Sequence, residues 1–295
     1  MDEHSEPELP RAVALAWGVA ANPQRGPKRE LSIERIVEVA VQLADAGGLA
    51  SVSMAAVASE LGFTPMSLYR YVSAKDDLVL LMQESGIGVP PESVLEADGW
   101  RAGLRALEHE QLAAYVDHPW LLDIPVPSMP VTPNDLAWLD AGLQVLSQTG
   151  LSASERLAVV LAVGAQARWE GAVRRSHADA AGDDREARDS AILASLVTAE
   201  EFPAVAVALQ EGVFGPGSGA DPFAFGLERV LDGVEVFLTG RSPAAPAAVG
   251  ALEKEAERDV RYREAVKARR EAEKKVREAR KRERELLKAA IEKLR

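Results

Sequence analysis

The chain has 295 residues, of which 47% are hydrophobic, and a formal net charge of −12. This length and composition are enough for two folded domains and exclude a disordered chain. The sequence has no cysteine, so disulfides, thiolate metal sites and cysteine nucleophiles are excluded as well. The N-terminus lacks a signal-peptide pattern, and no apolar run approaches the roughly 20 residues of a membrane span. We therefore expect a cytoplasmic protein with no membrane partner.

Residues 1–30 are rich in Pro, Glu and Ala and predict a mobile arm with a half-ordered helix at the apolar patch 13–19. The arm ends in the basic segment 25–29, in which Lys28 and Arg29 are candidates for reaching a DNA minor groove. The alternative for this segment is a solvated linker. A small phosphate-contacting surface needs only a few basic residues, so the negative net charge does not exclude DNA binding.

Residues 31–81 contain one local pattern three times, and it is the pattern that starts a helix. A Ser or Thr that can act as N-cap follows one apolar residue and precedes another by four positions, which makes a hydrophobic staple. The three cases are Leu31-Ser32 with Ile36, Val52-Ser53 with Val57, and Phe63-Thr64 with Leu68. Pro65 suits the first position of the third helix, where its missing N–H is not needed. The pattern predicts helices over 32–46, 53–61 and 65–72.

Three short helices within about fifty residues are typical of a helix-turn-helix DNA-binding domain. A fourth helix is expected from Ser73, because the run Ser73-Ala74-Lys75-Asp76 resembles a capping box. Glycines and prolines between 86 and 91 end this helix and indicate a domain boundary. We therefore assign residues 31–86 to a DNA-binding domain.

The segment 92–242 is predicted to be a second, wholly helical domain. Helical periodicity and the Pro- and Gly-rich breaks between periodic segments predict helices over 100–117, 134–149, 154–176, 186–211 (interrupted at Pro203) and 223–239. The helix over 154–176 is apolar on nearly every side between Leu157 and Ala167, as expected at the centre of a bundle. The expected fold class is therefore all-α.

The tail, residues 252–295, differs in composition from the rest of the chain. It has 17 Lys and Arg against 11 Asp and Glu, a net charge of +6, whereas the remainder has a net charge of −18. Its Ala, Glu, Lys and Arg content predicts a long charged helical extension of about 65 Å at about 1.5 Å per residue. The weak, Ala-rich seam favours a solvated helix over a strong coiled coil. The abrupt change in composition leaves open an appended, engineered segment.

The run from Leu61 to Val72, with Lys75 and Leu78, resembles the recognition segment of TetR-family repressors. The resemblance covers residues 31–82. The segment 221–233 is similar, more weakly, to the last core helix of the tetracycline-repressor-like C-terminal domain. Together these resemblances imply an N-terminal helix-turn-helix domain followed by a ligand-binding and dimerisation bundle.

Helical spacing places Leu68 and Tyr71 or Val72 on the inner side of the third helix. It therefore turns four side chains outward near the helix start, namely Pro65, Met66, Ser67 and Arg70. Ser67 can hydrogen-bond a base edge, and Pro65 and Met66 suit thymine methyl groups.

The family pattern adds Tyr69 to these base-facing residues. The resemblance also implies phosphate contacts for Thr64, Tyr71 and Lys75, and Ser53 is suitably placed on the preceding helix. For Tyr69 or Tyr71 taken alone, ordinary packing remains the alternative.

The resemblance implies a small-molecule effector that binds in the C-terminal bundle. Aromatic residues with a few polar groups can line an apolar pocket, and the candidates are Tyr115, Trp120, Trp138, Gln166 and Trp169. Plain core or interface packing remains the alternative for each of them. Tetracycline–magnesium ligands have no residue-level match in this chain.

A homodimer is implied because a two-fold protein reads paired half-sites on DNA. The helices over 154–176 and 223–239 are predicted to form its four-helix interface, since apolar residues on several of their sides can serve both the core and a partner. The four histidines fall in no metal-ligand or catalytic-triad spacing, and we expect no cofactor, metal or catalytic residue.

The sequence thus predicts a ligand-responsive transcriptional regulator, most consistent with a repressor that binds a palindromic operator and releases it when a small molecule binds. Two alternatives remain. One is an effector-independent DNA-binding activator or architectural protein, and the other is a helical enzyme.

Overall fold

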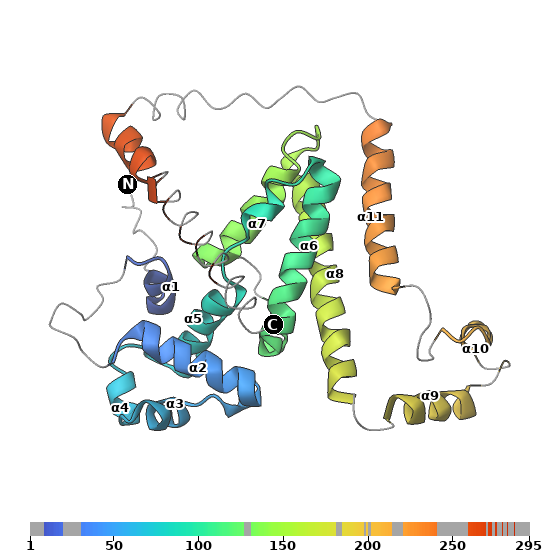
Figure 1. The fold of residues 1–295 in the computed structure, drawn as a ribbon, viewed down its shortest axis with the longest axis horizontal. Helices are drawn as coiled ribbons and strands as arrows, with labels where there is room; N and C mark the ends of the chain where they lie inside the picture. Colours follow the sequence, from blue (N-terminus) through green and yellow to red (C-terminus); the bar gives the residue numbers. More distant parts are fainter. Residues whose placement is uncertain are drawn as a thin grey trace, which may run out of the picture. The chain divides into compact units, whose positions relative to one another are not determined.

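The computed structural model describes residues 9–19, 31–126, 131–180, 185–197, 199, 202–213, 221–240 and 259–269, with isolated positions between 271 and 286. Over these ranges the regular structure is helical, with no strand, which confirms the all-α fold class (Figure 1). By its internal contacts the chain divides into two units, residues 1–244 and 245–295. Within the described part, no helix is long and apolar enough to cross a membrane.

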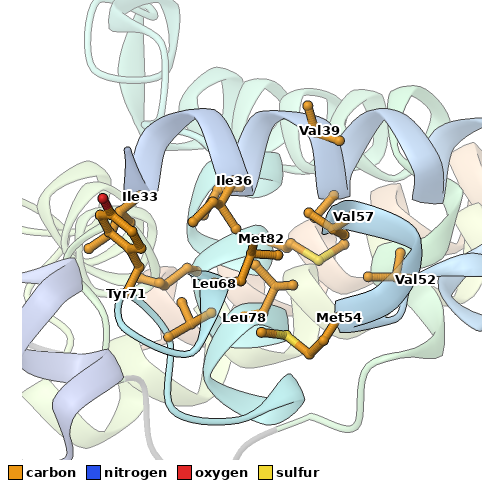
Figure 2. Close-up of a cluster of buried hydrophobic side chains, with 14 of the residues drawn as sticks. Ile33, Ile36, Val39, Val52, Met54, Val57, Leu68, Tyr71, Leu78 and Met82 are labelled. Atoms are coloured by element: carbon orange, nitrogen blue, oxygen red, sulfur yellow. The ribbon is translucent and has the colours of Figure 1, made fainter. Parts of the chain in front are cut away.

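The first part of unit 1 is a small helical head. It consists of α2 (Ile33–Gly47), α3 (Met54–Leu61), α4 (Pro65–Leu68) and the N-terminal half of α5 (Lys75–Ile87). The second residue of each predicted staple is fully buried, and all three belong to one apolar cluster: Ile36, Val57 and Leu68. Figure 2 shows Ile36, Leu68, Leu78 and Met82 pointing toward one another beneath α2. This core fixes the angles between α2, α3 and α4.

Two of the three predicted N-caps form as expected. Ser32 Oγ accepts the Arg35 N–H at 3.2 Å, and Ser53 Oγ accepts the Ala56 N–H at 3.0 Å. Thr64 occupies the N-cap position of α4 as predicted, but its side chain accepts no backbone N–H, and Thr64 Oγ1 instead lies 3.0 Å from Ser67 Oγ.

In the head, α4 and α5 each differ from the prediction at one boundary. Helix α4 ends at Leu68 instead of Val72, because the chain turns inward there to bury Tyr71, whose hydroxyl donates to the Leu31 carbonyl oxygen at 3.2 Å. Helix α5 begins at Lys75, so its N-cap position is one residue later than predicted. The carboxylate of Asp77 accepts the Ser73 N–H at 3.1 Å, where the sequence pattern had suggested Asp76 for this role.

The apolar patch of the N-terminal arm forms helix α1 (Arg11–Ala16), and this helix is docked on the head. Its Ala12 and Val13 are buried, and it packs against α5. Arg11 donates to the Arg70 carbonyl oxygen at 2.9 Å, and Trp17 Nε1 donates to the Val131 carbonyl oxygen at 2.9 Å. The expected half-ordered helix is therefore a packed one. Lys28 and Arg29 lie outside the described residues.

The second part of unit 1, the body, is a helical bundle. It contains α6 (Gly99–Asp117), α7 (Pro133–Val145), α8 (Ala153–Ala180), α9 (Arg185–Leu196), α10 (Pro203–Gln210) and α11 (Pro222–Thr239). Helices α6 and α8 lie side by side (Figure 1), and a second apolar cluster joins α6, α7, α8 and α11. The predicted break at Pro203 is confirmed, because α10 begins there.

Arginines on α6 attach α11 to the bundle. Arg101 lies 2.6 Å from Glu228 and 2.7 Å from Glu235, and it also pairs with Asp232. Arg105 adds a second contact to Glu228, at 2.5 Å. Hydrogen bonds from Arg105 and Arg101 lower the pKa of Glu228 to about 2. Because these groups are partly exposed, the network orients α11 more than it stabilises the fold.

Gly142 lets α7 and α8 approach closely. A Cβ at this position would lie 2.8 Å from both Cγ atoms of Val160 and 3.1 Å from Leu107 Cδ2. We expect Gly142→Ala to lower the free energy of unfolding by about 1–3 kcal/mol through overpacking, measured by urea denaturation. Gly226→Ala is the control, since its Cβ would meet only the Gln166 amide, at 3.8 Å. An unchanged urea midpoint for Gly142→Ala would contradict this packing.

Candidate nucleic-acid interface

The outward face of α4 is the candidate nucleic-acid interface of the head. Gly62 adopts the left-handed conformation, with φ of 74°, at the turn between α3 and α4. Leu68 and Val72 are fully buried, so the opposite side of the segment faces solvent. On that side Met66 is 74% exposed and Tyr69 is 45% exposed. Large apolar side chains held outward on a short, well-anchored helix are typical of a surface that contacts a partner.

The other residues of the predicted DNA interface are distributed over three helix starts. Thr64, Pro65 and Arg70 are exposed on or beside α4, and Ser67 is half-buried. Ser53 and Lys75 are exposed at the starts of α3 and α5. Tyr71 differs from these, because its ring is buried and its hydroxyl bonds the Leu31 carbonyl. For Tyr71 the structure favours the packing alternative.

A short segment between α6 and α7, η3 (Pro119–Asp123), connects the head to the body. Asp45, near the C-terminus of α2, accepts a hydrogen bond from Trp120 Nε1 at 2.6 Å and lies 2.8 Å from His118 Nδ1. The Trp120 ring is fully buried and packs against Gly86 on α5, where an added Cβ would lie 3.0 Å from the ring. The η3 segment therefore contacts two helices of the head, α2 and α5.

Helix α8 holds the same segment from the body side. Arg168 donates to the carbonyl oxygens of Leu122 and Ile124 at 2.9 and 2.7 Å. Arg175 donates to the Pro119 carbonyl oxygen at 2.8 Å and pairs with Asp123 at 2.9 Å. We did not predict these contacts of Arg168 and Arg175 from the sequence. Their signal in the sequence is two arginines seven residues apart on one helix, a spacing that places them on the same face.

A second link joins the connecting helix α5 to α7. The Glu84 carboxylate accepts the Asn134 N–H at 3.0 and 3.1 Å, and the Asn134 side chain donates to the Glu84 carbonyl oxygen at 2.7 Å. Burial raises the pKa of Glu84. At the first turn of α7 the Glu84 carboxylate accepts one of the N–H groups that have no partner within the helix, and the helix dipole favours a negative charge there.

The five residues predicted to line an effector pocket lie at different places. Trp120 belongs to the core of the head, and Trp138 belongs to the core of the body, with its Nε1 donating to the Gly88 carbonyl oxygen at 3.0 Å. Gln166 donates to the Phe223 carbonyl oxygen at 2.6 Å and so joins α8 to α11. Tyr115 is half-buried under the Arg168 guanidinium, whereas Trp169 is exposed on α8. Long-range packing, which residue type does not reveal, separates these side chains.

Comparison with known proteins identifies the family. Residues 36–82 match the bacterial regulatory proteins of the tetR family, and residues 92–238 match the tetracyclin repressor-like C-terminal domain. The chain is 35% identical over 244 residues to the HTH-type transcriptional repressor DrrR1 of Streptomyces coeruleorubidus, covering 79% of this chain and 88% of that protein.

Solved structures with the same architecture come from Streptomyces coelicolor. Apo ActR aligns with a TM-score of 0.60 at 21% identity, covering 73% of this chain and 100% of ActR. ActR in complex with actinorhodin aligns with a TM-score of 0.59 at 22% identity, covering 70% and 98%. At 21% and 22% identity, this structural similarity shows a shared fold and nothing about function.

A helix-turn-helix head on an all-helical body, with an outward recognition helix, defines the class of DNA-binding transcriptional regulators. The two family matches and the match to DrrR1 over 244 residues identify the family within that class. The chain belongs to the TetR family of bacterial regulators.

Proposed function

We propose that this protein is a ligand-responsive repressor that binds a palindromic operator as a homodimer and releases it when a small-molecule effector binds. The observation that carries the proposal is the exposed face of α4, which presents Met66 and Tyr69 on a head that otherwise buries its apolar residues. A relative of the chain is named a repressor, and ActR has been crystallised with actinorhodin. Such a regulator would act in the cytoplasm and needs no catalytic step.

In this proposal the head divides its contacts between bases and phosphates. Base contacts come from the exposed face of α4, with Pro65, Met66, Ser67, Tyr69 and Arg70. Phosphate contacts come from Thr64, Ser53 and Lys75, whereas Lys28 and Arg29 in the arm would reach the minor groove. Contacts of the second kind position the head, whereas those of the first kind read the sequence.

The dimer in this proposal uses the exposed sides of α8 and α11. Helix α8 buries Val160, Val163 and Ala167 in the bundle, while its other side carries an exposed stripe at four-residue spacing: Leu157, Leu161, Ala165 and Trp169. Helix α11 likewise buries Leu227 and Leu231 and exposes Phe225 and Val236. Apolar stripes of this kind on two neighbouring helices favour a self-complementary four-helix contact.

The conformational change that releases the operator would pass from the body to the head through η3. An effector that favours one arrangement of α6 and α8 would move Arg168 and Arg175, and with them the segment that bonds Asp45 on α2. The two heads would then take a spacing that no longer matches the half-sites. The effector acts by binding one conformer more tightly than the other.

The experiment is operator binding by fluorescence anisotropy at physiological salt, using DNA that flanks the gene. We expect the wild type to prefer this DNA to random DNA by about a thousandfold or more. Tyr69→Ala should lower operator affinity by about tenfold or more, because truncating one base-contacting side chain removes about 1–3 kcal/mol. Val116→Ala, which truncates an exposed apolar residue on α6, is the control. If the wild type bound this DNA no more tightly than random DNA, the proposal would be contradicted.

A further inference from the structure

Two glutamates face each other inside the body, between α6 and α8. Glu108 is 7% exposed and Glu170 is 4% exposed. Burial, together with the negative charge of Glu170, raises the pKa of Glu108 to about 7. Burial and the neighbouring Glu170 carboxylate therefore favour the protonated form of Glu108 near neutral pH. An arrangement of this kind weakens the fold, since each charge would be better solvated in water.

The same place contains two buried acceptor atoms that have no donor. Over the part of the chain that the structure describes, Glu108 Oε1 and Gln111 Oε1 are enclosed without a hydrogen-bond partner. Three residues separate them on α6, so they lie on one face of that helix. A Cβ added at Gly164 on α8 would lie 3.3 Å from Gln111 Oε1, which shows that this face is turned to α8. Unsatisfied buried acceptors are rare and destabilising.

Two glycines on α8 lie opposite polar residues of α6. Gly164 faces Gln111, and Gly171 faces Tyr115, where an added Cβ would lie 3.0 Å from the tyrosine Cβ. These two glycines are seven residues apart and therefore lie on the same face of α8. At these two positions α8 therefore presents no side chain to α6.

Among the described residues, the positive charge that acts on Glu108 comes from one partly exposed side chain. Arg174 pairs with Glu170 at 2.5 Å and also lies 3.9 Å from Asp221, ahead of α11. The charged groups that act on Glu108 are Glu170 and Arg174 on α8 and Asp221 before α11. The carboxyl groups of Glu108, Glu170 and Asp221 therefore lie near the single guanidinium of Arg174. Glu108 Oε1 receives no hydrogen bond. The site is short of both positive charge and N–H donors.

We propose that Glu108, Gln111 and Glu170 form the subsite that binds the ammonium group of an amine-bearing effector. An ammonium has three N–H donors and no acceptor, which matches a site whose two unpaired buried atoms are both acceptors. One N–H would satisfy Glu108 Oε1, a second Gln111 Oε1, and a third the Glu170 carboxylate. This inference rests on the proposed function, because it specifies the chemistry of the effector.

Binding would release a proton. Below about pH 7 the ligand-free Glu108 carboxyl is protonated, and the ammonium takes the place of that proton, which leaves to solvent as Glu108 becomes a carboxylate. Affinity for an amine is therefore expected to rise with pH up to about 7 and then to level off. The amine itself stays protonated across this range, as a lysine side chain does.

The test compares 2-phenylethylamine with 2-phenylethanol, which has the same size and no charge, by isothermal titration calorimetry at pH 6 and pH 8. For the wild type we expect the amine to bind about tenfold more tightly than the alcohol at pH 8, a difference of about 1.4 kcal/mol. At pH 6 the preference should shrink by about tenfold, with close to one proton released per site.

Glu108→Gln should abolish both the preference for the amine and its pH dependence while leaving binding of the alcohol unchanged. Glu110→Gln, which removes a charge from the same helix at a residue bonded to Ser93, should behave as wild type. Should Glu108→Gln fold poorly, Gln111→Leu is the second variant, with about a fivefold loss for the amine alone.

Failure to bind 2-phenylethylamine up to about 1 mM, equal affinity for amine and alcohol, or a preference that survives in Glu108→Gln would each overturn the inference. Operator binding is measured separately, in the absence of either compound. A protein that prefers its operator but not the amine would therefore retain the proposed function and lose only this subsite.

Discussion

Replacing both Leu161 and Val236 with aspartate is expected to give a folded monomer whose operator affinity is lower by about a hundredfold or more. These side chains are 60% and 71% exposed on α8 and α11, so the protomer does not need them for its own core. In the proposed dimer each would meet the partner, and the two-fold axis doubles every introduced charge. An unpaired charge buried in an interface is strongly unfavourable. Sedimentation velocity measures the oligomeric state, and anisotropy measures operator binding.

Val116→Asp is the matched control for this experiment. It introduces the same charge at an exposed valine on α6, outside the two stripes. We expect it to remain dimeric and to bind operator as the wild type does. A double variant that sediments as a dimer with unchanged affinity would show that the α8 and α11 stripes are not the interface.

Trp120→Ala is expected to lower the free energy of unfolding by about 3–5 kcal/mol, the range for truncating a buried aromatic side chain. The ring is fully buried against Gly86, and its Nε1 donates to Asp45 at 2.6 Å. Because these contacts join η3 to α2 and α5, the loss should separate unfolding of the head from that of the body. Urea denaturation followed by circular dichroism would then show two transitions in place of one.

Trp120→Phe tests the hydrogen bond apart from the packing. It keeps most of the ring and removes the N–H, so we expect a smaller loss of about 1–3 kcal/mol. Trp17→Ala removes a largely exposed tryptophan and is the control, with a loss of about 1 kcal/mol or less. If Trp120→Ala unfolded at the same urea concentration as Trp17→Ala, η3 would not be the structural link between head and body.

The helices of this protein were predictable because their signals are local. The staples at Ile36 and Val57, the caps at Ser32 and Ser53 and the break at Pro203 all depend on residues within five positions of one another. Errors arose where a distant contact overrode the local pattern. Tyr71 leaves the helical path because its hydroxyl bonds the carbonyl of Leu31, 40 residues away.

The sites divide in the same way. Exposure of Met66 and Tyr69 follows from the spacing of one short helix, so the outward face of α4 was predicted correctly as a surface, whereas the packing of Tyr71 was left as an alternative. The pocket prediction relied on residue type alone, and the structure distributes Trp120, Trp138 and Trp169 between two cores and the solvent. The charge of Arg168 and Arg175 gave no hint that backbone carbonyls of η3 would be their partners.

The sequence by itself determined that the chain is all-helical and that a helix-turn-helix head begins it, because N-caps, staples and helical periodicity act over a few residues. The tertiary structure alone decided what joins the head to the body and which polar groups are buried without partners. Asp45 meets Trp120 across 75 positions, and the Glu108 carboxyl meets Glu170 only when α6 and α8 pack. Contacts between residues so far apart in the chain depend on how whole helices pack, and no local pattern specifies that packing.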